Sequence, residues 1–286
     1  MDNNGILKGW NDIFNQTLEK MKKEAEGKHG ISTLRGYRSF MKIGDSRISD
    51  IIGKAITSLQ RDVNELIPDN IEMFQHSNSR GFPQRTLAIS KARFLSNMNN
   101  RKLEESLERS IVASTSEYLF NQFNLLSGIN NTAHQGKRAS VDFIDLREKN
   151  YLRIIELKQW GNHSDSPICS LLEVVSYYFA FLKIIHIEPT YFKDSLNRYG
   201  LFVLAPVEYY EYWRIEPEKI DFIEKTANKY LTTATNNDVL FNYKKLEIKR
   251  DIFVDMIRGV ADTYGNISDV NKEIIKNTYL NSINSK

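Results

Sequence analysis

Hydrophobic and polar positions in the second half of the chain switch repeatedly between a helical period and a strand period. Residues 102–120 and 167–187 repeat apolar side chains at helical spacing, and Pro167 suits a first helical turn. Strand-like patterns lie at 139–146, 151–160, 199–206 and 239–248. Helical patterns return at 217–231 and near the end of the chain. This order predicts an α/β fold with a mixed central sheet flanked by helices.

The N-terminal part of the chain is predicted to be mostly helical. Residues 10–21 and 48–67 have helical spacing, and the second pattern stops at Pro68. A loop is expected at 77–84, and residues 96–100 form a polar break. We therefore expect a helical region over residues 1–100, in a position to contact DNA, before a main domain over 101–286.

The amino-acid composition is typical of a globular protein in a reducing compartment. The chain has 286 residues, of which 41% are hydrophobic and 26% charged, as in ordinary globular domains. The single cysteine, Cys169, cannot form an internal disulfide, so a reducing compartment is expected. The first residues lack the pattern of a signal peptide, and the most apolar stretch, 174–185, is too short to span a bilayer. We expect a cytoplasmic protein with no membrane partner.

Positive charge is unevenly distributed, although the net charge is only +3. The acid-free stretch 73–103 carries six basic residues, and two more precede the first predicted strand. Such a distribution suits contact with a phosphate backbone, and a solvated surface without a partner is the alternative. The candidate nucleic-acid-binding residues are Arg80, Arg85, Lys91, Arg93, Lys137 and Arg138.

Two neighbouring predicted strands, 139–146 and 151–160, carry the candidate chemistry. Because side chains alternate along a strand, Glu156 and Lys158 share one face. A loop over 148–150, with Asn150 in the left-handed conformation, places Asp142 opposite Glu156 and turns Asp145 away. Pairing Asp145 with Glu156 instead would centre the turn between Asn150 and Tyr151, which is poor turn chemistry.

The two acids and the lysine suit phosphodiester hydrolysis. Asp142, Glu156 and the Leu157 carbonyl supply the hard oxygen ligands that Mg²⁺ prefers, and Mn²⁺ is the expected substitute. A bound divalent cation lowers the pKa of water, and Lys158 can position that water or stabilise developing negative charge. The triplets 26–28 and 247–249 also read Glu-x-Lys, but only 156–158 combines a hydrophobic strand with an upstream Asp on the matching face.

These residues resemble the motif of the PD-(D/E)XK nuclease superfamily, the restriction-endonuclease-like proteins. Asp142, Glu156 and Lys158 match its first acid, second acid and lysine, although Val141 stands where the motif has Pro. The resemblance implies an αβββαβ core with these residues catalytic on adjacent antiparallel strands. It also implies an acid on the preceding helix. We expect Glu108 there as a metal ligand, ahead of Glu104, with a solvated helical acid as the alternative; the other acids of this segment are Glu105 and Glu117.

Other chemistries are less well supported. The five histidines show no pair at ligand spacing, and one cysteine excludes a zinc ribbon. The chain has no glycine-rich phosphate loop, so no nucleotide cofactor is expected.

The resemblance therefore predicts a Mg²⁺-dependent DNA endonuclease of the type II restriction or phage-defence kind. Cutting both strands requires two active sites, so a homodimer is expected. Three alternatives remain: an RNA-cutting nuclease, a nuclease-like subunit without catalysis, and a helical interaction module in which the hairpin is structural.

Overall fold

The structure is a computed structural model that describes residues 10–29, 46–75, 100–115, 118–124, 140–160, 165–187, 196–261 and 267–285. Within these residues the centre is a mixed five-stranded sheet in the order β1-β2-β3-β4-β5. The strands are β1 (Leu119–Asn124), β2 (Ser140–Glu148), β3 (Tyr151–Leu157), β4 (Arg198–Pro206) and β5 (Asp238–Leu246). The first three pair antiparallel and the last three pair parallel, so the predicted α/β class with a mixed sheet is confirmed.

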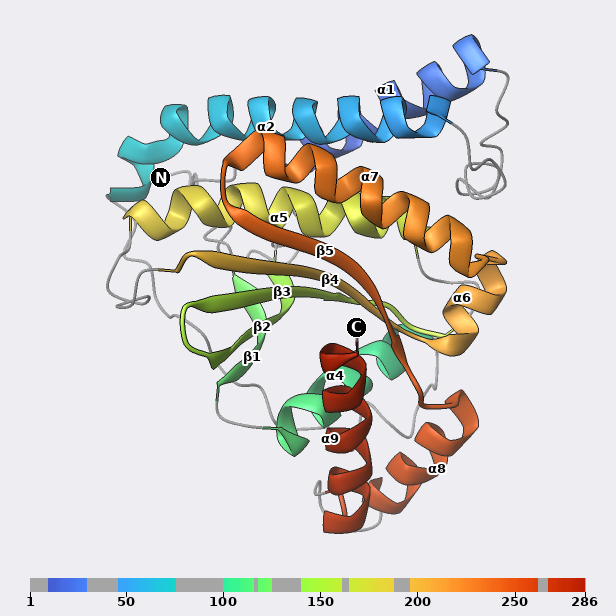
Figure 1. Ribbon diagram of the computed structural model, residues 1–286. Coiled ribbons are helices and arrows are strands. Elements are labelled where there is room, and N and C mark those ends of the chain that lie inside the picture. Colours follow the sequence, from blue (N-terminus) through green and yellow to red (C-terminus); the bar gives the residue numbers. More distant parts are fainter. Residues whose placement is uncertain are drawn as a thin grey trace.

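Helices cover both faces of the sheet (Figure 1). One layer contains α1 (Trp10–His29), α2 (Ser46–Gln75), α5 (Pro167–Ile187) and α7 (Pro217–Thr235). The opposite layer contains α4 (Asn100–Ser114), α8 (Arg250–Ala261) and α9 (Asp269–Asn284), and the short α6 (Val207–Trp213) follows β4. Because α5 and α7 lie in the crossovers between parallel strands, β3 and β4 are buried along nearly their whole length. None of the described helices is both long enough and apolar enough to cross a bilayer.

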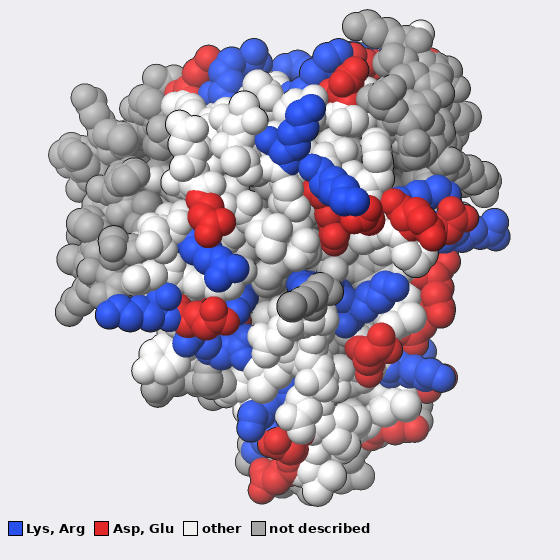
Figure 2. All heavy atoms as spheres, in the orientation of Figure 1, with Lys and Arg blue, Asp and Glu red and all other residues white. Residues whose placement is uncertain are grey.

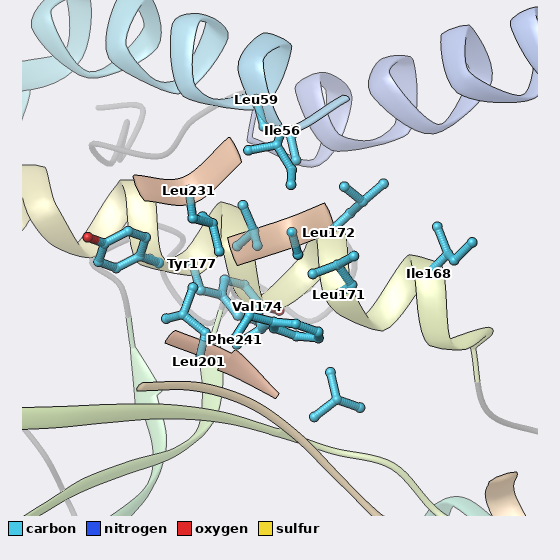
Figure 3. Close-up of a cluster of buried hydrophobic side chains, with 14 of the residues drawn as sticks. Ile56, Leu59, Ile168, Leu171, Leu172, Val174, Tyr177, Leu201, Leu231 and Phe241 are labelled. Atoms are coloured by element: carbon cyan, nitrogen blue, oxygen red, sulfur yellow. The ribbon is translucent and has the colours of Figure 1, made fainter. Parts of the chain in front are cut away.

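The larger hydrophobic core joins the N-terminal helices to the sheet. Figure 3 shows Ile56 and Leu59 of α2 close to Leu172 of α5 and Leu231 of α7, with Leu201 of β4 below them. All five side chains are fully buried in one cluster. The helical region expected before the main domain therefore shares its core with the sheet. Of the polar break expected at 96–100, residues 96–99 lie outside the described part of the chain, as does the loop expected at 77–84.

A second core fills the opposite face. Leu107 and Ile111 of α4 pack with Phe143 of β2, Ile155 of β3 and Tyr279 of α9. These strand residues alternate with those of the larger core, as a sheet buried on both faces requires. The hairpin between the two cores is consequently held from both sides.

The predicted register of this hairpin is confirmed, but the loop expected over 148–150 is one residue too long. Glu148 belongs to β2 and pairs with Tyr151, so Lys149 and Asn150 alone form the turn. Asn150 has a φ of 60°, the left-handed conformation, and follows Lys149 in the turn. Phe143 pairs with Ile155 and Ile144 with Ile154, which is the register that the loop chemistry predicted. The pairing is irregular only between Asp145 and Glu148, next to the turn.

The helix predicted over 102–120 is too long. The structure ends α4 at Ser114 and begins β1 at Leu119, a strand that the sequence pattern did not predict. The Ser114 and Thr115 hydroxyls donate to the carbonyls of Ser110 and Ile111, and such side-chain bonds weaken the end of a helix.

The helix predicted to stop at Pro68 is too short. α2 runs on to Gln75, beyond the proline. A proline inside a helix removes one backbone hydrogen bond and crowds the preceding turn. The turns before Pro68 are packed against α5 and α7 through residues such as Ile56 and Leu59. This packing holds the helix in place despite the local cost of the proline.

The outer edge of β5 is covered by side chains of α7. Asn228 donates from Nδ2 to the Phe241 carbonyl (3.1 Å) and accepts from the Phe241 N–H (2.6 Å). One turn earlier, Glu224 Oε1 accepts from the Tyr243 N–H (2.7 Å). The helix thus provides the hydrogen bonds that a further strand would otherwise provide.

Candidate functional site

The end of β3 places a carboxylate and an ammonium side by side. The Lys158 N–H donates to the Leu204 carbonyl of β4 (2.9 Å), so the chain continues along the sheet just beyond Leu157, where the strand ends. Lys158 Nζ lies 2.7 Å from Glu156 Oε1, and both residues are only 5% exposed. Buried charges at the end of a central strand require partners, and these two residues meet part of that need themselves.

Asp142 approaches the same place from β2. Continuing the observed register by one residue sets Asp142 opposite Glu156, and directly opposed residues share a face. Asp142 Oδ2 also accepts a hydrogen bond from the Leu157 N–H (2.8 Å). The structure therefore brings together the two acids and the lysine that the sequence singled out.

Asp145, the other acid of this strand, belongs to the opposite face. It pairs with Arg153 across the hairpin, and its carboxylate accepts from Arg147 Nε (2.8 Å) and from the Tyr279 hydroxyl of α9 (3.2 Å). These partners match its complete burial, so Asp145 is part of the packing between the hairpin and α9. The expectation that it points away from Glu156 is confirmed.

A third acid comes from the helix that covers β3. Glu173 of α5 holds Lys158 Nζ with Oε2 (2.9 Å) and accepts from the Tyr177 hydroxyl with Oε1 (3.1 Å). Both residues lie in the segment 167–187 that the sequence predicts as a helix, but the strand motif does not assign them to the site. Their spacing of one helical turn was the available signal, because it puts Glu173 and Tyr177 on one side of α5.

The glutamates of α4 differ in their surroundings. Glu108 is buried and accepts from Asn121 Nδ2 of β1 (2.7 Å), and its negative charge acts on Asp142. Glu104 also acts on Asp142, more weakly. Glu105 forms an ion pair with Arg109 on the same helix. Glu117 lies outside the described residues.

The electrostatics of the cluster favour an additional positive charge. Burial raises the pKa of Asp142 well above its usual range, with Glu108 and Glu104 adding to the effect. Burial, followed by the charges of Asp142 and Glu173, raises the pKa of Glu156 in the same way. Burial alone would lower the pKa of Lys158, but Glu156 and Glu173 outweigh it, and the pKa of Lys158 is raised. Lys158 therefore stays an ammonium ion at neutral pH.

The metal that the resemblance implies would need several oxygen ligands directed at one point. No three acidic, histidine or cysteine side chains of the described ranges converge, as they stand, in a group able to hold one ion. Asp142 and Glu156 nevertheless offer oxygen ligands from adjacent strands, and Glu156 Oε2 is buried without a hydrogen-bond partner among the described residues. A hard divalent cation would satisfy that oxygen and offset the repulsion between the acids. Two carboxylates on adjacent strands are thus the type of ligand that Mg²⁺ prefers.

The basic residues expected to contact phosphates cannot be placed. Arg80, Arg85, Lys91, Arg93, Lys137 and Arg138 all lie outside the described residues. On the face shown in Figure 2, acidic and basic side chains of the described residues are interspersed rather than separated by sign.

Comparison of the chain with models of known protein families, with curated proteins and with solved structures found no match. Its function is therefore inferred from its own residues.

Proposed function

We propose that the chain is a metal-dependent DNA endonuclease with a restriction-endonuclease-like core, acting as a restriction or phage-defence enzyme. The observation that carries the proposal is the convergence of Asp142, Glu156 and Lys158 at one end of a rigid hairpin. The element order α4-β1-β2-β3-α5-β4 supports it, since it repeats the αβββαβ succession that the resemblance implies.

Each residue has a distinct part in the proposed reaction. Asp142 and Glu156, with the Leu157 carbonyl, hold Mg²⁺, and Glu108 is the candidate for a further ligand from α4. When bound, the metal lowers the pKa of a water molecule and polarises the phosphoryl group. Two cores fix the hairpin, so the ligands keep their positions.

Lys158 acts in this scheme as a charge stabiliser. Because its pKa is raised, the ammonium keeps its proton at neutral pH and is a poor general base. It donates hydrogen bonds to the attacking water or to phosphoryl oxygens. One P–O bond forms to the water oxygen while the opposite P–O bond breaks, and the additional negative charge of the transition state lies within reach of Lys158.

The decisive experiment is nicking of a supercoiled plasmid with and without Mg²⁺. We expect wild-type protein to nick only with the metal, and Lys158→Met to be slower by about 10²–10³-fold, as when one charge-stabilising donor is lost. Lys225→Met is the matched control, because Lys225 is exposed on α7 and forms an ion pair with Asp221 of the same helix. Equal rates for wild type and Lys158→Met would refute the assignment, and cleavage of structured RNA but not DNA would change the substrate.

A further inference from the structure

Lys158 has two carboxylate partners on two different elements. Its Nζ lies 2.7 Å from Glu156 Oε1 on β3 and 2.9 Å from Glu173 Oε2 on α5. Only Glu156 belongs to the pair proposed to hold the metal. Glu173 is itself oriented by the Tyr177 hydroxyl, which donates to its other oxygen from one helical turn further along α5.

Glu156 is required both as an ion-pair partner of Lys158 and as a ligand of the proposed metal. A divalent cation on Glu156 would draw on the same negative charge that holds Lys158, and two cations at contact distances repel each other. Lys158 is almost completely buried, so its ammonium cannot simply turn into water. A second anion is needed if Lys158 is to stay in the site once the metal is present.

Glu173 meets this need. We propose that Glu173 is a positioning residue that keeps Lys158 beside the substrate phosphate and frees Glu156 to bind the metal. The inference rests on the proposed function, because it assumes that Asp142 and Glu156 bind a divalent cation. In the absence of Glu173, Lys158 keeps Glu156 as its ion-pair partner within the described part of the chain, and competes with the metal for that carboxylate.

Metal binding without nucleic acid tests this role. Titration calorimetry of the full chain with Mn²⁺ should show a dissociation constant about tenfold higher for Glu173→Ala than for wild type, the size expected for loss of one charge-assisted contact. Glu173→Gln, which keeps the shape and one acceptor oxygen, should lie between the two. Glu24→Ala is the matched control: Glu24 also holds a lysine, Lys54, and its side chain is 19% exposed against 20% for Glu173.

A double-mutant comparison separates positioning from a simple effect of charge. If Glu173 acts through Lys158, Lys158→Met and Lys158→Met/Glu173→Ala should bind Mn²⁺ with constants that agree within about twofold. If Glu173 merely attracts the metal, its removal should weaken binding equally in both backgrounds, and the inference fails. It fails also if Glu173→Ala and Glu173→Gln, both folded by circular dichroism, bind as wild type does.

Failure of the proposed function would give a different set of results from failure of the role of Glu173. If the wild-type protein binds no Mn²⁺ and nicks no plasmid, the proposed metal site is refuted, and the proposed role of Glu173 is refuted with it. A wild type that binds and cuts, with unchanged Glu173 variants, would overturn only the role of Glu173.

Discussion

Buried acids that face one another across two strands lower the stability of the folded chain. Asp142 and Glu156 both have raised pKa values, mainly because they are buried, and the negative charge of Asp142 further disfavours ionisation of Glu156. The charged forms of both acids are therefore less favoured in the folded protein than in the unfolded chain. Residues that reduce stability and occupy one place in the fold are typical of functional sites.

This arrangement predicts a stabilising substitution. A raised folded-state pKa contributes stability at low pH that is lost as the pH rises through it. Asp142→Asn cannot ionise, and its amide oxygen can still accept from the Leu157 N–H. In metal-free buffer at about pH 8 we expect a gain of about 0.5–2 kcal/mol in the free energy of unfolding.

Thermal unfolding at several pH values measures this effect. The melting temperature of Asp142→Asn should exceed that of wild type by a few degrees at about pH 8, with the difference vanishing near pH 4, where the unfolded carboxyl is itself half protonated. A variant that is less stable than wild type at the higher pH would contradict the electrostatic account.

Two of the three glutamates of α4, Glu108 and Glu105, make a second comparison at this scale. Glu108→Gln keeps an acceptor for Asn121 but removes the charge that acts on Asp142. We expect its Mg²⁺-dependent nicking rate to fall about 10–100-fold, as for residues that orient metal ligands. Glu105→Gln should have little effect, because Glu105 pairs with Arg109. The reverse order would exclude Glu108 from the site.

At the residue scale, the sequence predicted the positions of those side chains that strand alternation determines. Asp142, Glu156 and Lys158 come together because one turn sets the register of two strands; their catalytic role stays a prediction. The contact of Glu173 with Lys158 depends instead on how α5 lies across β3. No local pattern specifies that angle, so only the fold shows it.

Among the elements, the hairpin was the easiest to predict and α4 with β1 the hardest. Asn150 marks the turn because asparagine tolerates a left-handed backbone. The end of α4 follows from hydroxyl groups that bond back to the helix, whereas the apolar spacing alone suggests that the helix continues. The continuation of α2 beyond Pro68 likewise depends on packing that a local rule does not include.

The turn itself can be tested. Asn150→Ala should destabilise the protein by about 1 kcal/mol, since a Cβ without a polar group disfavours the left-handed conformation, whereas Asn150→Gly should be close to neutral. Urea denaturation gives both values, and Lys149→Ala is the control within the same turn. If alanine and glycine behave alike at position 150, the backbone conformation does not determine the turn.

The whole molecule is built around one sheet that the N-terminal helices also cover. The sequence predicted the α/β class and the presence of those helices. It did not predict that α2 would pack on α5 and α7, because an apolar helix face does not identify its partner. The position of α5 above the site therefore depends partly on a segment far away in the sequence.

Cooperative unfolding should reveal this dependence. Leu59→Ala removes a fully buried side chain between α2 and the helices over the sheet, and should cost about 2–5 kcal/mol. We expect one unfolding transition by circular dichroism and by tryptophan fluorescence, shifted to lower temperature, while Thr57→Ala on the exposed side of α2 changes little. Two separate transitions would show that the N-terminal helices unfold independently.

The α7 side chains along β5 limit how copies of this chain can associate. A neighbouring molecule cannot extend the sheet past Phe241 and Tyr243 unless it first displaces Asn228 and Glu224. A continuous intermolecular sheet across the middle of this edge is thereby disfavoured, and so is fibrillar stacking that begins there. Any dimer that positions two such sites on opposite strands of a duplex has to form through a different surface.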